Sequence, residues 1–292
     1  MALRRKLSML ALALALAGGC ATSGKHDDGA TNPGTPATYE ARTTLARELV
    51  ERGDWGRAFA MLDGLHREKP GDAQVLTLRG IVYRERGLFA DSETDLKAAV
   101  AADPKLPEAH AALGILYDLQ MREEAEVQHR EAVRLAPNNP AFLNNLGFSL
   151  FLRKQYKEAI TQYDRAASLA PLSRRVRTNL GFACAAVGDL RRAAREFQMG
   201  GTPAEAKNNL GFAYERRGDM NNAYDMYLEA VRLDPSAQKA RSNLVHAAQE
   251  LGRPVPTEAT PPAPAPAQPA AGSDENSKQT TPTEPSPTEG NQ

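Results

Sequence analysis

A block of about 34 residues recurs along the middle of this 292-residue chain, and it restricts the possible folds more than any other feature. A Leu-Gly dipeptide marks four of the blocks, at Leu113-Gly114, Leu146-Gly147, Leu180-Gly181 and Leu210-Gly211. From Gly80 onward, the glycines at this place are separated by 34, 33, 34 and 30 residues. A repeat of this length indicates one supersecondary unit per block, and such units must stack because none buries its apolar face alone.

Two further landmarks recur in step with the glycine. An alanine follows the glycine by eleven or twelve residues, as at Ala125 and Ala159, and a proline closes the block. The closing prolines are Pro70, Pro104, Pro137, Pro171 and Pro235. Small residues let two helices approach closely, and a proline just past a helix prevents its continuation. The pattern therefore predicts two antiparallel helices in each block.

These positions resemble the tetratricopeptide repeat, and the resemblance covers residues 39–252. It implies an all-α superhelix of about six helix pairs plus a C-terminal capping helix, flanked by disordered segments, with the first helix of each pair lining a concave face. The expected units are 39–72, 73–106, 107–139, 140–173, 174–203 and 204–237, and the expected capping helix is 238–251.

Two units depart from the pattern. The third lacks a glycine in its turn, at Leu119 to Arg122, and is one residue shorter there. The fifth ends early, near Gly200-Gly201, and the next helix is expected to begin with a capping box in which Thr202 caps and Glu205 reaches back.

The N-terminus has the features of a secretion signal over residues 1–19. Three basic residues precede an apolar run from Leu7 to Ala17, which is too short to span a bilayer. The small residues before Cys20 resemble the lipobox of bacterial lipoproteins. That resemblance implies lipidation of Cys20 and, with Ala21 after it, an outer-membrane anchor facing the periplasm. An ordinary cleaved signal peptide is the alternative.

The flanking segments are expected to be disordered. Residues 20–38 begin with the cysteine and continue as a polar tether without apolar periodicity. Residues 253–292 form a Pro/Ala/Thr-rich tail with ten prolines and no aromatic residue. Such a composition cannot bury enough apolar surface to offset the entropy of ordering.

No motif in the sequence predicts catalysis or a cofactor. Lys+Arg and Asp+Glu both total 36, so no net field favours nucleic acid. The five histidines are scattered without metal-ligand spacing, and we find no phosphate loop or nucleophile elbow. Cys184 falls at a helix seam and is expected to be a buried, inert thiol. We therefore predict no enzyme activity, metal, cofactor or small-molecule substrate.

The expected binding surface is the concave groove of the C-terminal half. The sixth position of successive units holds Asn145, Asn179, Asn209 and Asn243, and the ninth holds Phe148, Phe182 and Phe212. Amides suit the backbone of an extended peptide, and aromatic rings anchor side chains of a partner. The alternative is that the asparagines bridge neighbouring helices and the phenylalanines pack between units. An arginine cluster in the fifth unit, Arg174 to Arg195, indicates either a solvated face or an acidic protein partner.

Three segments, Leu113 to Leu119, Asn144 to Leu150 and Arg177 to Ala183, resemble tight-adherence (Flp) pilus assembly lipoproteins of the TadD type. The resemblance implies a scaffold with protein partners, among them the outer-membrane secretin and pilus machinery. Two alternatives remain open from the sequence: a cell-envelope adaptor for peptidoglycan enzymes, and a chaperone or non-catalytic subunit of an exported enzyme system.

Overall fold

The computed structural model describes residues 38–257, and all regular structure within that range is helical. Its thirteen α-helices are α2 (Tyr39–Glu51), α3 (Trp55–Glu68), α4 (Ala73–Glu85), α5 (Phe89–Ala102), α6 (Pro107–Leu119), α7 (Glu124–Leu135), α8 (Pro140–Leu152), α9 (Tyr156–Leu169), α10 (Arg174–Ala186), α11 (Leu190–Gly200), α12 (Pro203–Arg216), α13 (Met220–Leu233) and α14 (Gln238–Glu250). The predicted signal segment, Cys20, most of the tether and residues 258–292 of the tail lie outside the described residues. None of the helices from α2 to α14 is both long and apolar enough to cross a membrane.

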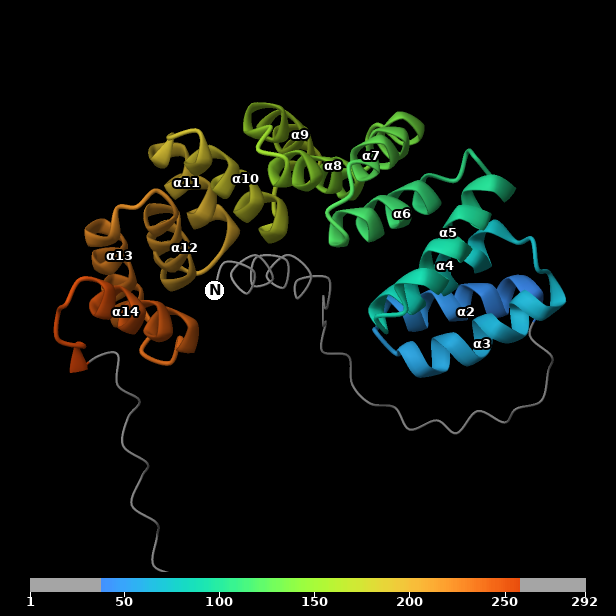
Figure 1. Cartoon of the computed structure of the whole chain (residues 1–292), viewed down its shortest axis with the longest axis horizontal. Helices are drawn as coiled ribbons and strands as arrows, with labels where there is room; N and C mark the ends of the chain where they lie inside the picture. The colour runs from blue at the N-terminus through green and yellow to red at the C-terminus, as the bar shows by residue number, and fades with distance from the viewer. Residues whose placement is uncertain (1–37, 258–292) are drawn as a thin grey trace, which may run out of the picture.

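The helices form six consecutive pairs and a single last helix, which follow one another along an open arc (Figure 1). Each helix packs against its neighbours in the chain. Neighbouring even-numbered helices also pack against each other along the whole series, from α2 and α4 to α12 and α14, while the odd-numbered ones have no comparable contact. The even-numbered helices therefore line the tighter, inner face. The predicted all-α tetratricopeptide-repeat superhelix is confirmed.

The repeated glycine lies where the two helices of a pair meet. Each such glycine faces one large side chain of the second helix: Gly80 faces Leu96, Gly114 faces His129, Gly147 faces Tyr163, Gly181 faces Phe197 and Gly211 faces Tyr227. A β-carbon on any of these glycines would lie 2.5 to 2.8 Å from the opposing side chain. The predicted role of this position, to let the helices approach, is confirmed.

The turn within each pair requires one residue in the left-handed region. Gly87, Gly188 and Gly218 take it at φ values of 77°, 95° and 81°, which glycine adopts without steric cost. The third and fourth pairs place Met121 and Lys154 there instead, at φ 58° and 63°.

The turn of the third pair is one residue shorter than the repeat pattern, and this changes the start of α7, the second helix of that pair. Helix α7 has 12 residues, whereas α5, α9 and α13 each have 14. Its first amides make short-range bonds, from Ala125 N to Arg122 O and from Glu126 N to Glu123 O, both 3.3 Å. These are the i→i+3 bonds of a 3₁₀ turn, so the deletion tightens the helix start.

Replacing Met121 by glycine is expected to stabilise the protein by about 1 kcal/mol, because a side chain in the left-handed region costs roughly that much. The Met121 side chain is 62% exposed, so little packing is lost. Met199 is 51% exposed and lies in the last turn of α11, where the same substitution is expected to destabilise by about 0.5 kcal/mol. Denaturant midpoints of the two variants should move in opposite directions; a shift in the same direction contradicts the strain at Met121.

The capping box predicted before the sixth pair is present. The Thr202 hydroxyl accepts from Glu205 N at 3.2 Å, and the Glu205 carboxylate accepts from Thr202 N at 2.7 Å. Pro203 occupies the first position of α12, where its missing N–H has no cost. Helix α11 is the shortest in the described range at 11 residues and ends at Gly200. The capping box thus starts α12 directly after a shortened helix.

Candidate functional site

A pocket of about 230 Å³ opens on the inner face of α8, α10 and α12. Six aromatic side chains line it, namely Phe148, Phe151, Tyr156, Tyr163, Phe182 and Phe212. Thr178, Asn179, Arg216 and Arg217 contribute the polar part of the wall. The repeat produces this clustering because it places a phenylalanine at the same position of three consecutive pairs.

The aromatic rings of the pocket hold one another in place. The ring centroid of Phe182 lies 4.8 Å from that of the fully buried Phe197 and 5.8 Å from that of Phe212, at interplanar angles of 63° and 88°. A third pair, Phe151 and Tyr156, has centroids 5.3 Å apart. Edge-to-face contacts of this kind add stability beyond the buried area. Phe148, Phe182 and Phe212 remain only partly buried, so the pocket is a preformed apolar surface.

Four of the seven side chains predicted for the groove come together in this pocket: Phe148, Asn179, Phe182 and Phe212. The other three, Asn145, Asn209 and Asn243, do not line it, although all are partly buried. Sequence reasoning missed the contributions of Phe151, Tyr156 and Tyr163. Tyr156 and Tyr163 belong to α9, the second helix of its pair, and Phe151 lies near the end of α8, three residues after Phe148.

Two of the predicted asparagines bridge neighbouring inner helices. Asn179 Nδ2 donates to Asn144 Oδ1 at 3.0 Å, and Asn243 Nδ2 donates to Asn208 Oδ1 at 2.8 Å. The accepting residues are only 3% and 6% exposed. For these two positions, the bridging alternative describes the structure, and one of the two N–H donors of each amide is already used. The signal for it lay in the adjacent asparagines Asn144-Asn145 and Asn208-Asn209.

The asparagine bridge is interrupted at the pocket. Helix α10 has Thr178 at the position where α8 and α12 have the accepting residues Asn144 and Asn208. The side chain of Asn209, on the next inner helix, makes no hydrogen bond within the described residues. Asn145 is likewise without a side-chain hydrogen bond to the described part of the chain, because the preceding helix has Ala111 at the accepting place. Of the four predicted asparagines, Asn145 and Asn209 therefore have side-chain amides that are not used in hydrogen bonds with described residues.

The arginine cluster of the fifth pair is partly paired within the protein. Arg174 contacts Glu205 at 2.6 Å, Arg177 contacts Glu196 at 2.9 Å, and Arg192 contacts Asp164. Arg175 differs, since it has no hydrogen bond or ion pair with any described residue, and burial lowers the pKa of its guanidinium. It precedes Asn179 by four residues and Phe182 by seven, which places all three on one face of α10.

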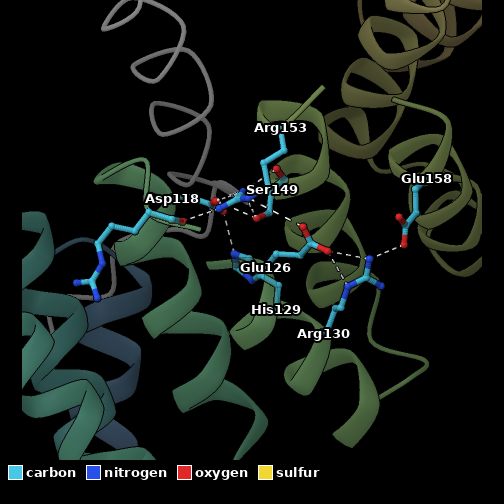
Figure 2. Close-up of polar contacts among 8 residues, drawn as sticks. Asp118, Glu126, His129, Arg130, Ser149, Arg153 and Glu158 are labelled. Carbon is cyan, nitrogen blue, oxygen red and sulfur yellow. Dashed lines mark hydrogen bonds and ion pairs between the residues drawn. The ribbon is translucent and has the colours of Figure 1, made fainter. Parts of the chain in front are cut away.

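A buried polar network joins the third helix pair to the fourth (Figure 2). The Asp118 carboxylate, 4% exposed, accepts from Ser149 Oγ at 2.9 Å and Arg153 Nη1 at 3.1 Å, and contacts His129 Nε2 at 2.9 Å. Arg153 also donates to the Arg122 carbonyl at 2.5 Å, in the shortened turn. The network continues through Glu126 and Arg130 to Glu158 on α9. Asp118 thus connects three helices of two different pairs.

The serine, histidine and aspartate of this network do not form a catalytic triad. The Ser149 hydroxyl bonds to Asp118 and Arg153, and no hydrogen bond within the described residues joins it to His129. Ser149 is 0% exposed, so no substrate reaches it. A nucleophile needs a base within hydrogen-bond reach. The arrangement therefore serves packing between pairs.

Neither a reactive thiol nor a metal site is found between residues 38 and 257. Cys184 is 1% exposed, and burial raises the pKa of its thiol to about 11. A thiol that stays protonated and covered is a poor nucleophile. No group of three or more His, Cys, Asp or Glu side chains in this part of the chain has an arrangement that would hold a metal ion.

Comparison with known families and relatives fits the geometry. Tetratricopeptide-repeat family models match residues 43–107, 140–173 and 204–236, and none of these models describes a catalytic family. Over 94 residues, the chain is 32% identical to the type IV pilus assembly protein PilF of Pseudomonas aeruginosa, covering 32% of this chain and 36% of PilF. Over 148 residues, it is 30% identical to the TPR repeat-containing protein PA4299 of the same species, covering 49% and 58%. The chain thus spans about a third of the first relative and somewhat over half of the second.

Solved structures share the fold at low identity. PilW, a type IV pilus biogenesis factor, matches with a TM-score of 0.61 at 16% identity, covering 72% of this chain and all of PilW. The structure of P. aeruginosa PilF matches with a TM-score of 0.57 at 18% identity, covering 71% and 97%. YrrB, a TPR protein with an unusual peptide-binding site, matches with a TM-score of 0.50 at 22% identity, covering 64% and 97%. The chain has the tetratricopeptide-repeat fold, and part of it is similar in sequence to a type IV pilus assembly protein.

Proposed function

We propose that this chain is a non-catalytic scaffold in pilus assembly and that it binds a segment of a partner protein in the aromatic pocket of α8, α10 and α12. The pocket is the observation that carries the proposal. Its volume of about 230 Å³ is below the roughly 300–1,000 Å³ of most small-molecule sites, which suits one or two side chains of a polypeptide. Rigid, partly exposed aromatic rings are the residues that contribute most at protein interfaces.

The comparisons support the pilus part of the proposal. PilF is described as a type IV pilus assembly protein, and PilW as a type IV pilus biogenesis factor. YrrB, of the same fold, is described as having a peptide-binding site. The finer assignment, to a tight-adherence pilus, rests on the motif resemblance at Leu113 to Leu119, Asn144 to Leu150 and Arg177 to Ala183. Genes for a secretin and a pilus ATPase beside this one would support it, and genes for cell-wall hydrolases would count against it.

Removing the two central phenylalanines tests the pocket. We expect Phe182→Ala with Phe212→Ala to reduce co-purification of secretin and pilus assembly components from cell envelopes at least tenfold, since aromatic anchors contribute about 2 kcal/mol or more each. Circular dichroism should show unchanged helix content. Leu169→Ala is the control, because Leu169 is 45% exposed at the end of α9 and does not line the pocket. Equal recovery of partners by both variants would contradict the proposal.

The place of the scaffold is proposed from the N-terminal residues: a lipid on Cys20 holds it at the outer membrane, facing the periplasm. Several acyl chains, each buried methylene contributing about 0.8 kcal/mol, anchor a protein stably. We expect Cys20→Ser to move the chain from the membrane fraction to the soluble periplasmic fraction on cell fractionation. Retention of the variant in the membrane fraction would remove the lipid anchor from the account.

A further inference from the structure

Two unpaired arginines lie on the inner face on either side of the aromatic pocket. Arg175 is on the same face of α10 as Phe182, seven residues before it, and Arg216 is on the same face of α12 as Phe212, four residues after it. Arg216 ends its helix, is exposed and, like Arg175, makes no ion pair or hydrogen bond with a described residue. The inner face around the pocket thus carries two cations with nothing to neutralise them.

The acidic side chains nearest in sequence are already engaged. The Glu205 carboxylate accepts from Arg174 at 2.6 Å and from Thr202 N at 2.7 Å. Glu215 accepts from the Tyr227 hydroxyl at 2.6 Å and lies 3.7 Å from His246. On α8, the face that contains Phe148 has no charged residue, since Ala141, Asn145 and Leu152 share it. The unsatisfied charge at the pocket is therefore positive.

Along the helix axes, the two arginines lie on opposite sides of Phe182 and Phe212; Arg216 lines the pocket, and Arg175 lies outside its lining. Phe182 and Phe212 occupy the same position in their repeats, each one residue after the seam glycine. With a rise of 1.5 Å per residue, Arg175 lies about 10 Å to one side of this level and Arg216 about 6 Å to the other. Because packed helices also lie roughly 8–10 Å apart, the total separation is about 18 Å, which an extended peptide covers with roughly five to six residues. Carboxylates two or three residues from a central apolar side chain would reach both guanidiniums.

We infer that the pocket selects a partner segment in which one large apolar side chain is flanked on both sides by carboxylates. The apolar side chain fills the aromatic pocket, and the carboxylates bind Arg175 and Arg216. Hydrogen bonds between charged partners are the stronger ones, and Arg175 loses little further hydration because it is already partly buried. The inference rests on the proposed function and narrows the chemistry of the partner.

Three matched peptides test the inference with the purified full chain. The first is a blocked, dye-labelled heptapeptide with tryptophan at its centre and two glutamates on each side, separated from the tryptophan by glycine. The second has lysines in place of the glutamates, and the third has alanine in place of the tryptophan. By fluorescence anisotropy, we expect the first to bind at least tenfold more tightly than either of the others. Its affinity should fall as salt is raised, since exposed ion pairs are screened.

Substitution of the two arginines tests their contribution to binding separately from that of the aromatic pocket. Arg175→Gln with Arg216→Gln should reduce the preference for the glutamate over the lysine peptide at least tenfold, without loss of helix content. Arg191→Gln is the control, because Arg191 is exposed on α11, away from the pocket, and should leave the preference unchanged. Equal binding of the glutamate and lysine peptides, or a preference that survives both substitutions, overturns the inference.

The outcomes also distinguish this inference from the proposed function. If no peptide binds while the Phe182 and Phe212 variant still loses its cellular partners, the acidic selectivity is wrong and the scaffold function stands. If the glutamate peptide binds as expected while partner recovery does not depend on these phenylalanines, the site chemistry stands and the proposed function fails.

Discussion

Replacing Asp118 by alanine is expected to lower the free energy of unfolding by about 3 kcal/mol, because it leaves buried polar partners without an acceptor. His129 is 1% exposed and loses the only hydrogen bond of its ring within the described residues, and the Ser149 hydroxyl and Arg153 guanidinium lose a charged partner. Because Asp118 belongs to the third helix pair and Ser149 to the fourth, the change also weakens the contact between pairs. In a stack of repeats, a weakened contact lets the two parts unfold separately.

Two probes report this separation. The only tryptophan, Trp55, lies in α3 near one end of the stack, whereas far-ultraviolet circular dichroism reports all helices. In guanidinium chloride, the fluorescence and dichroism transitions of Asp118→Ala should diverge more than those of the unchanged chain. Glu158→Ala is the control, since Glu158 is the exposed end of the same network and its pair with Arg130 contributes about 0–1 kcal/mol (Figure 2). Equal losses in both variants would contradict the role of Asp118.

Gly181→Val is expected to destabilise the protein by about 2–3 kcal/mol through overpacking. A β-carbon at this position would lie 2.5 Å from a carbon of the Phe197 ring, which is fully buried and has no room to move away. Phe197 also contacts Phe182 in the pocket. The substitution should therefore weaken partner binding as well as shift the thermal and denaturant midpoints.

A glycine without a close neighbour provides the control. Gly64 lies inside α3, and nothing lies within 4 Å of a β-carbon placed on it. Gly64→Ala is expected to stabilise the protein by about 1 kcal/mol, the usual difference between these residues in a helix interior. If Gly181→Val and Gly64→Ala changed stability in the same direction, the close approach at the seam would not be what selects glycine.

The features that were predictable from the sequence are those set by short-range chemistry. The seam glycines, the turn glycines and the Thr202 capping box each depend on a few neighbouring residues. The regular spacing of the glycines was therefore enough to predict helix pairs and a superhelix. The phenylalanines at Phe148, Phe182 and Phe212 meet in one pocket because equal positions in consecutive repeats fall side by side. The asparagines three residues before them were harder to interpret, since each bridges only where the preceding inner helix has an asparagine to accept its hydrogen bond, as Asn144 does for Asn179.

The buried polar network around Asp118 was not predicted, because the one-residue deletion in the turn of the third pair shifts His129 relative to the repeat pattern. His129 faces Gly114 as Tyr163 faces Gly147, but it follows its glycine by 15 residues instead of 16. The residue missing from the third turn causes this offset, and the same turn leaves the Arg122 carbonyl to accept from Arg153. His129 occupies a position that is aromatic in the last three pairs, but this correspondence is visible only after the repeats are aligned with the one-residue gap. Contacts across pairs, such as Asp118 with Ser149, leave no periodic signal.

The most direct test of the central claim is photocrosslinking from inside the pocket in living cells. Benzoylphenylalanine at position 148 should link the chain to a partner peptide, whereas the same group at position 169 should give no comparable product. The linked peptide, mapped by mass spectrometry and synthesised, should bind the unchanged chain at least tenfold more tightly than the Phe182→Ala, Phe212→Ala variant. Equal crosslinking from both positions, or binding that ignores the two phenylalanines, would contradict a polypeptide-binding role for the pocket.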